Sequence, residues 1–292
     1  MSGKVVVVTG ASSGFGNLTV QELARRGHTV VATMRDIEGR NATVRKELID
    51  AVKAEGHVLQ VLEMDVADEA SVNSTIDQVV MQHKKIDVLI NNAGIMPVGI
   101  TEAYTLADVE RLFAVNFFGA VRADRAVLPH MRAAGSGLLV HVTSLMGRVV
   151  FPFFGTYSAS KFALEGLAEA YRYELKGFGI DSLIVEPGPF PSNLISSSPE
   201  PSDQAVLDSY GEVAAIPGQI KANANAGHDE ANPPRPQRVA DAIAQLVETT
   251  ERRPLRTVVM PEGMDFGIRR LNDAVSPIQN DLLTSLGMSS MI

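Results

Sequence analysis

The segment YSASK at 157–161 places a tyrosine and a lysine four positions apart. Residues with this spacing lie on one face of a helix, so the ammonium group of Lys161 is expected near the phenol of Tyr157. A free tyrosine has a pKa near ~10, and a neighbouring cation lowers that pKa because it stabilises the phenolate. The pair therefore predicts a proton donor that can be restored near neutral pH, as general acid–base catalysis requires.

A serine and a glycine-rich turn accompany this pair. Ser144 lies thirteen positions before Tyr157, at the end of an apolar run. Its hydroxyl could donate to an oxygen that gathers negative charge during a reaction. YxxxK alone arises readily by chance, but a serine at a strand end and a glycine-rich first turn make a chance match improbable.

The segment VTGASSGFGN at 8–17 holds three glycines directly behind Val5–Val8. Valine favours a buried strand, whereas glycine tolerates positive φ and lets another group approach the backbone. A strand that stops at such a turn before a helix predicts an anion at the helix N-terminus. An ordinary strand–turn–helix connection is the alternative from these residues alone.

Elements that could position these residues alternate through most of the chain. Strands are predicted at 4–8, 29–34, 58–64, 86–91, 138–143, 180–185 and 257–260, and helices at 15–27, 38–55, 69–84, 106–133, 157–177 and 238–250. The strands are almost wholly apolar, as in a parallel sheet covered on both faces. The pattern predicts an α/β fold with a doubly wound parallel sheet of the Rossmann type, as one domain over 1–292.

Two segments depart from this alternation. Residues 188–236 are rich in proline, serine, glycine and alanine, and we predict a substrate lid there because long segments of this kind are often functional. Residues 264–292 have weak amphipathic character, and the sequence assigns no role to this C-terminal extension.

In doubly wound sheets, ligands bind beyond the carboxyl ends of the strands. The residues that directly follow the predicted strands are therefore the candidate site: 10–16, Arg35, Asp65-Val66, the NNAG segment at 91–94, Ser144 and Pro187-Gly188.

The composition of the chain argues against several classes of binding partner. The 292-residue chain has a net charge of −8 and no cysteine, which argues against nucleic acid, an anionic membrane and thiolate metal sites. The histidines show no metal-ligand spacing, and no run of residues is long and apolar enough for a signal peptide or a membrane span. We expect a cytoplasmic protein without a metal.

TGASSGFG at 9–16, NNAG at 91–94, Asn116, Ser144 and YSASK resemble the short-chain dehydrogenase/reductase family, from about residue 4 to 188. The resemblance implies that Tyr157 is the acid/base, that Ser144 orients the substrate carbonyl and that Asn116 holds a water in a proton relay. Lys161 would bind the nicotinamide ribose and lower the pKa of Tyr157. Where the family often has PGxxxT, this chain has PGPFPS, which puts Ser192 at the place of the threonine.

The resemblance and the strand ends together define a nicotinamide cofactor site. Its predicted residues are Gly10, Ser12, Ser13, Gly14, Phe15, Gly16, Arg35, Asp65, Val66, Asn92, Ala93, Gly94, Tyr157, Lys161, Pro187, Gly188 and Ser192. Arg35 follows the second strand, where an arginine accommodates the 2′-phosphate of NADP and an acid favours NAD. We therefore expect a preference for NADP(H) over NAD(H). Asp36 leaves the ribose-binding alternative open.

Apolar residues follow the same strand ends and predict a neutral, bulky ketone or secondary alcohol as substrate. The predicted contacts are Met96, Leu145, Phe151, Phe154, Phe190 and Leu194. The structural alternative is that these apolar side chains only fill the core beneath the loops. The functional alternatives are a redox sensor without turnover, a halohydrin-dehalogenase-like lyase and a nucleotide-sugar epimerase. The resemblance also implies a homodimer or homotetramer formed through the helices at 106–133 and 157–177.

Overall fold

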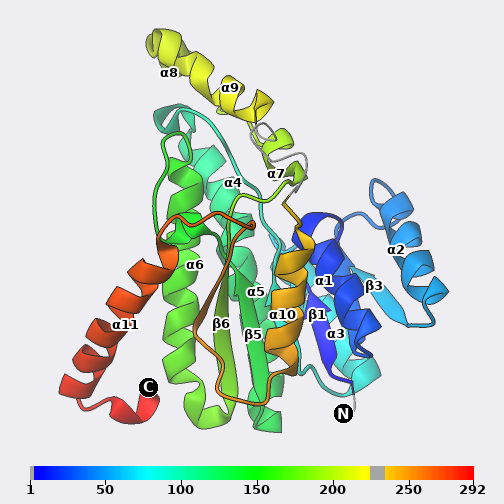
Figure 1. Cartoon of the computed structure of the whole chain (residues 1–292). Coiled ribbons are helices and arrows are strands. Elements are labelled where there is room, and N and C mark those ends of the chain that lie inside the picture. Colours follow the sequence, from blue (N-terminus) through cyan, green and yellow to red (C-terminus); the bar gives the residue numbers. More distant parts are fainter. Residues whose placement is uncertain (1–2, 224–233) are drawn as a thin grey trace.

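The computed structural model describes residues 3–223 and 234–292, and within them it contains a parallel sheet of seven strands (Figure 1). The strand order is β3-β2-β1-β4-β5-β6-β7. The strands are β1 (Val5–Val8), β2 (Thr29–Met34), β3 (Leu59–Glu63), β4 (Val88–Asn91), β5 (Gly137–Val142), β6 (Ile180–Pro187) and β7 (Arg256–Val259). Successive strands are added on one side of β1 as far as β3, and from β4 onward they are added on its other side. A crevice lies beyond the carboxyl ends of β1 and β4, where the strand order switches.

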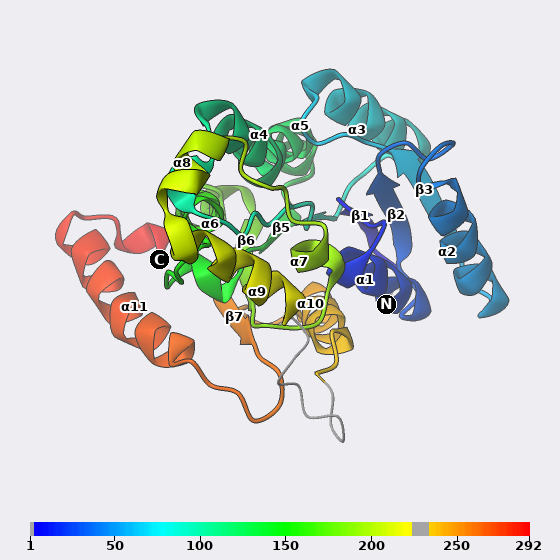
Figure 2. The ribbon, with the colours of Figure 1, turned by 90° about the horizontal axis from the view of Figure 1, so that it is seen from above.

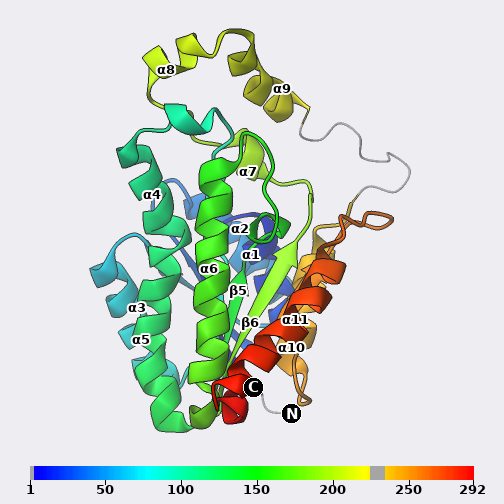
Figure 3. The ribbon, with the colours of Figure 1, turned by 90° about the vertical axis from the view of Figure 1, so that its left-hand side faces the viewer.

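Helices cover both faces of the sheet (Figure 2). One apolar core joins the sheet to α1 (Gly14–Arg25), α2 (Ala42–Ala54) and α10 (Gln237–Glu248). A second core joins the opposite face to α3 (Glu69–His83) and α5 (Phe118–Ala134). The helices α4 (Leu106–Asn116) and α6 (Gly155–Glu174) complete that second layer (Figure 3).

The strands form where the sequence predicts them because their side chains are buried on both faces. All four valines of β1 are buried, and alternate members belong to the two different cores. Burial on both sides favours uninterrupted apolar runs over alternating ones. The prediction of a doubly wound, Rossmann-type parallel sheet is confirmed.

The helix predicted at 106–133 is two helices. α4 ends at Asn116, Phe117 has φ −114° and ψ −62°, and α5 begins at Phe118. The side chain of Asn116 is bonded to the backbone of Ile95 on the neighbouring loop, directly before the break. Position 117 carries neither proline nor glycine, so the local sequence gives no sign of the interruption.

Above the carboxyl ends of the strands stand α7 (Asn193–Ser196), α8 (Gln204–Ser209), η4 (Gly211–Ala215) and α9 (Ile216–Ala222) (Figure 3). The segment is tied to the loop after β4. Val98 N donates to Ser198 Oγ at 2.7 Å, and Tyr104 Oη donates to the Pro199 carbonyl at 3.0 Å. The predicted lid at 188–236 coincides with this segment, but its residues 224–233 lie outside the described part of the chain.

The C-terminal extension contains α11 (Ile268–Ser285), which lies on the β7 side of the sheet, away from α2 and β3 (Figure 2). Ile268 at its start is fully buried, whereas Ile278, Leu282 and Leu286 further along are exposed. Over the residues that the structure describes, no helix combines the length and the apolar character that a membrane crossing needs.

Candidate active site

A cavity of about 450 Å³ opens at the carboxyl ends of the strands. It brings together nearly every residue that the sequence predicts for cofactor and substrate. The predicted residues along its wall are Gly10, Ser12, Ser13, Gly14, Phe15, Arg35, Asp65, Val66, Asn92, Ala93, Gly94, Met96, Ser144, Leu145, Phe154, Tyr157, Lys161, Pro187, Gly188, Phe190, Ser192 and Leu194. Gly16, Asn116 and Phe151 do not line it and support the wall from behind.

The glycine-rich turn is packed too closely for larger residues. Gly10 has φ +67°, and a Cβ there would lie 2.7 Å from the Ala93 Cα. A Cβ on Gly16 would lie 2.6 Å from the Gly10 carbonyl oxygen and 2.4 Å from Asn92 Nδ2. The first position requires a backbone conformation that side chains disfavour, and the second lets α1 pack directly against the turn.

The N-terminus of α1 faces the cavity through Ser13 and Gly14. Ser13 is extended, with φ −161° and ψ 176°, and its side chain makes no capping hydrogen bond. No acidic residue occupies the first turn of α1. Free N–H groups and the positive end of a helix attract an anion, so this turn fits the pyrophosphate of a dinucleotide.

The NNAG segment holds the turn in place. Asn92 Nδ2 donates to the carbonyl oxygens of Thr9 and Gly10 at 2.9 and 3.0 Å. The Thr9 hydroxyl in turn accepts from the backbone N–H groups of Asn92 and Ala93. These bonds join the carboxyl ends of β1 and β4, the two neighbouring strands between which the strand order switches. Thr9 is a supporting residue that the sequence interpretation did not single out.

Two arginines lie at the end of β2. Arg35 and Arg40 both line the cavity, and the guanidinium of Arg35 is 3.9 Å from the Asp65 carboxylate. Asp36 has φ +50°, and its carboxylate accepts from the backbone N–H of Arg40 at 2.9 Å. Asp36 therefore caps its own turn and is not among the residues of the cavity wall. The sequence does not single out Arg40, because it lies six positions beyond the strand, in a charged stretch without a motif.

Tyr157 and Lys161 lie on one face of α6, as their spacing predicts, and both are buried. Lys161 Nζ is 5.8 Å from the centre of the Tyr157 ring and donates to the Val142 carbonyl at 3.0 Å. Burial raises the pKa of Tyr157 to about 12, partly offset by a hydrogen bond with Ser144. Burial lowers the pKa of Lys161 to about 8, while the charge of Glu165 raises it.

In the protein alone the pKa of Tyr157 lies above that of a free tyrosine, and its lowering by Lys161 stays a prediction. Desolvation of the phenolate is the largest influence on this pKa, and Lys161 is not among the groups that shift it. The helical spacing indicated proximity correctly. It carried no information about how completely the surrounding apolar residues exclude water from the phenol.

Ser144 and Asn116 flank the pair. Ser144 Oγ accepts from the Met146 N–H at 3.1 Å, and the same hydroxyl forms the hydrogen bond that favours the Tyr157 phenolate. Asn116 donates to the Ile95 carbonyl and to Ser160 Oγ, and accepts from the Ile95 N–H. Ser160 donates to the Tyr157 carbonyl at 2.7 Å. Asn116 thus connects the loop after β4 with the helix that carries Tyr157.

Apolar side chains form the part of the cavity beyond Tyr157. Met96, Phe154 and Tyr157 are buried in one cluster, against which Phe151, Leu194 and Ile220 of α9 pack. Phe190 stands edge-on to Phe15 at 5.9 Å between ring centres, so it also belongs to the wall beside the glycine turn. Further residues of the wall are Met34, Asn41, Met64, Ile95, Val115, Val142, Thr143, Met146, Pro189, Asn193, Ile195 and Ser197.

The family model for short chain dehydrogenases matches residues 4–202. The chain belongs to this family. Its membership agrees with the resemblance drawn from the motifs, and it makes the chain an oxidoreductase whose fold binds a nicotinamide cofactor. The matched range ends within the α7–α9 region and leaves out β7 and α11.

Individual family members are similar over different lengths. An uncharacterized oxidoreductase from Bacillus subtilis is 34% identical over 88% of this chain and 89% of its own length. Retinol dehydrogenase 8 from Bos taurus is 36% identical over 87% of this chain and 80% of its own. For 3-ketodihydrosphingosine reductase from Bacteroides thetaiotaomicron the identity is 38%, but the match spans 65% of each chain, slightly less than two thirds.

A solved short-chain dehydrogenase from Streptomyces avermitilis superposes with a TM-score of 0.75 at 32% identity, and the match covers 99% of this chain and 98% of that one. A metagenomic short-chain oxidoreductase in complex with NADP has a TM-score of 0.69 at 26% identity, covering 90% and 99%. These structures share the family fold over most of this chain.

Proposed function

We propose that this family member is a reductase or dehydrogenase that uses NADP(H) and interconverts a neutral, bulky, apolar ketone and its secondary alcohol. The supporting observation is the position of Tyr157. Its buried phenol lies in a cavity wall that also contains the anion-binding glycine turn and the apolar cluster around Phe154. This arrangement supports a proton donor between a dinucleotide site and a site for an apolar substrate.

The chain's own residues would bind the substrate and move one proton. When bound, the nicotinamide cofactor supplies the hydride that reduces the carbonyl carbon. Tyr157 donates its phenolic proton to the carbonyl oxygen, and the O–H of Ser144 donates a hydrogen bond to the same oxygen when substrate is bound. Lys161 places a positive charge beside the resulting phenolate. Asn116 fixes Ile95 and α6 relative to each other, and its part in a water relay remains a prediction.

The preference for NADP(H) is supported at the end of β2. Arg35 and Arg40 offer two guanidinium groups to a 2′-phosphate, and guanidinium–phosphate bonds are among the stronger hydrogen bonds in proteins. The Asp36 carboxylate is engaged with the backbone of its own turn and is absent from the wall of the described cavity. NAD(H) remains a slower alternative in this proposal.

The substrate class is supported by the wall around Tyr157. Met96, Phe154 and Leu194 present apolar surface there. The names of two relatives support the apolar part of the proposal, since retinol is an apolar primary alcohol and 3-ketodihydrosphingosine a long-chain amino ketone. The named relatives are dehydrogenases and reductases, which favours turnover over the sensor alternative. We propose that α7–α9 act as a lid over this part of the cavity.

Assembly and location complete the proposal. We propose a homodimer or homotetramer formed through α4, α5 and α6, because Phe118 and Phe162 on these helices are 47% and 42% exposed. Large apolar side chains at a surface often mark contacts between proteins. We place the enzyme in the cytoplasm. A chain without cysteine forms no disulfides, which suits a reducing compartment.

The deciding experiment is turnover. The purified protein is incubated with NADPH or NADH and a panel of aliphatic, alicyclic, aromatic and steroid-like ketones, and loss of the reduced-nicotinamide absorbance is followed. Turnover with NADPH of the larger neutral ketones is the expected result. Binding of NADPH without turnover of any ketone or alcohol would contradict the proposal and favour the sensor alternative.

A further inference from the structure

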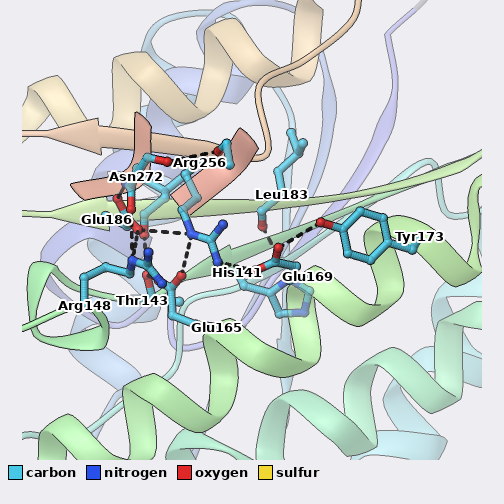
Figure 4. A network of polar contacts seen from close by, with 12 residues as sticks. His141, Thr143, Arg148, Glu165, Glu169, Tyr173, Leu183, Glu186, Arg256 and Asn272 are labelled. Carbon is cyan, nitrogen blue, oxygen red and sulfur yellow. Dashed lines mark hydrogen bonds and ion pairs between the residues drawn. The ribbon is translucent and has the colours of Figure 1, made fainter. Parts of the chain in front are cut away.

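A buried polar network joins α11 to the segment that carries Ser144 (Figure 4). Asn272 of α11 accepts from Arg148 Nε at 2.9 Å and donates to the Glu186 carboxylate at 2.7 Å. Asn272 is 9% exposed and Glu186 is fully buried. Arg148 lies just beyond the Ser144 turn, and Glu186 directly precedes Pro187 and Gly188 of the cavity wall. One amide therefore connects two parts of the site.

The position of Arg148 bears on the Ser144 turn through the backbone. The turn η2 (Leu145–Gly147) is closed by bonds from Gly147 N to the Ser144 carbonyl and from Arg148 N to the Leu145 carbonyl. Beside it, Ile268 at the start of α11 is fully buried in one cluster with Leu145 and Met260. A polar and an apolar contact of the same helix thus hold the turn.

Further charged groups surround Glu186. Arg256 of β7 lies 3.5 Å from Glu186 Oε1 and 3.0 Å from Glu165 on α6, and it also binds Glu169. Arg148 Nε lies 4.0 Å from the same Glu186 oxygen, which has no hydrogen-bond partner among the residues that the structure describes. Two guanidinium groups thus face three carboxyl groups, and burial together with the charge of Glu165 raises the pKa of Glu186 to about 7.

We propose that Asn272 is a positioning residue for the reaction: by bridging Arg148 and Glu186, it fixes the Ser144 turn against the end of β6. The inference rests on the proposed function, and it assigns a role to the C-terminal extension, which lies beyond the family-model match. A neutral amide suits this place because it can accept from a cation and donate to a carboxylate at once.

Two substitutions separate positioning from general support of the fold. Asn272→Leu removes both hydrogen bonds and leaves Arg148 and Glu186 without their partner. Asn272→Asp keeps the acceptor for Arg148 and places a second carboxyl group against Glu186. Two adjacent carboxyl groups share a proton at lower pH, which restores a hydrogen bond between them. At higher pH both ionise and repel each other, although Arg148 and Arg256 remain nearby.

The expected result is a difference in pH profile. Asn272→Leu should lower kcat about tenfold at every pH, with little change in the dissociation constant of NADPH. Asn272→Asp should approach the wild-type kcat near pH 6 and lose it as the pH rises. Asn280→Asp is the control, because it adds the same charge to an exposed site on α11 and should keep the wild-type profile.

Hydrogen exchange supplies a readout that needs no substrate. The amides of Met146, Gly147, Arg148 and Val149 are all hydrogen-bonded in the structure. Asn272→Leu should speed exchange in a peptide that contains them and leave a peptide from β2 unchanged. Unaltered exchange there with wild-type kcat would overturn the inference, as would equal losses in the Leu and Asp variants at every pH. If the wild type reduces no ketone, the proposed function fails, and the exchange result still decides the positioning.

Discussion

Lys161 Nζ lies 5.8 Å from the centre of the Tyr157 ring, and burial shifts the pKa values of the two groups in opposite directions. The phenol, with a pKa of about 12, holds its proton throughout the neutral range. The lysine, with a pKa of about 8, is charged at neutral pH but close to losing its proton. This state is ready to donate a proton, which is the requirement for carbonyl reduction.

The first prediction concerns that donor. Tyr157→Phe removes one hydroxyl from a buried ring and should lower kcat for ketone reduction by roughly 10²–10⁴, the usual contribution of a positioned acid. NADPH affinity, measured by the fluorescence of the bound cofactor, should change little. Tyr171→Phe on the same helix is the control and should keep full activity. Retention of more than about a tenth of the wild-type kcat would exclude Tyr157 as the donor.

The second prediction concerns pH. The ammonium group of Lys161 is present below its pKa of about 8 and lost above it, so kcat for reduction should fall as the pH rises through that value. Lys161→Arg retains a charge whose pKa exceeds ~12, so its profile should stay flat to higher pH even if its activity is lower. A wild-type rate that is constant up to pH 10 would argue against a charged Lys161 in the rate-determining step.

The fold and most of the cavity wall could be predicted because they depend on local patterns. Apolar runs such as Val5–Val8 indicate strands buried on both faces, and the carboxyl ends of parallel strands must share one edge. That geometry collects Gly10, Asp65 and Ser144 without any knowledge of side-chain contacts. The four-residue spacing of Tyr157 and Lys161 likewise determines that they share a helix face.

Features that depend on contacts distant in sequence could not be predicted. The break at Phe117 accompanies the bonds between Asn116 and Ile95, and the raised pKa of Tyr157 depends on how tightly its neighbours pack. Asn272 meets Arg148 across 124 positions of sequence. No motif announces such a pair, because each residue alone has the appearance of an ordinary polar surface residue.

The third prediction concerns the cofactor. Arg35→Ala and Arg40→Ala should each lower kcat/KM for NADPH about tenfold or more, because a charge-assisted bond contributes about 1.5–3 kcal/mol. The values for NADH should change much less. Arg45→Ala is the matched control, since Arg45 pairs with Glu38 and does not line the cavity. Equal losses with both cofactors, or a wild-type preference for NADH, would contradict the assignment to the 2′-phosphate.

The fourth prediction concerns stability. The pKa of Glu186 is about 7 in the folded chain, above its ordinary value of 4.5, so the folded state binds this proton more tightly than the unfolded state does. Its contribution to stability is present below pH 4.5 and lost as the pH rises through 7, with a slope of up to about 1.4 kcal/mol per pH unit. Glu186→Gln should flatten this part of the curve of unfolding free energy against pH. If the unfolding free energies of the wild type and of Glu186→Gln changed by the same amount between pH 5 and 7, the dependence would belong to other groups.

The last prediction concerns substrate size. Each methylene buried against Met96, Phe154 and Leu194 should contribute about 0.8 kcal/mol, so kcat/KM should rise about fourfold per carbon until the cavity is full. Phe154→Ala enlarges the cavity beside Tyr157 and should move the optimum to longer or wider ketones. Phe178→Ala, at an exposed site outside the cavity wall, should leave the optimum unchanged.

Phe190 is a less informative site for this test, because its contact with Phe15 also supports the glycine turn. The measurement is kcat/KM for a homologous ketone series with one anionic keto acid included. A flat series, or a preference for the keto acid, would refute the apolar substrate class and leave the assignment of Tyr157 intact, because proton donation does not depend on what fills the rest of the cavity.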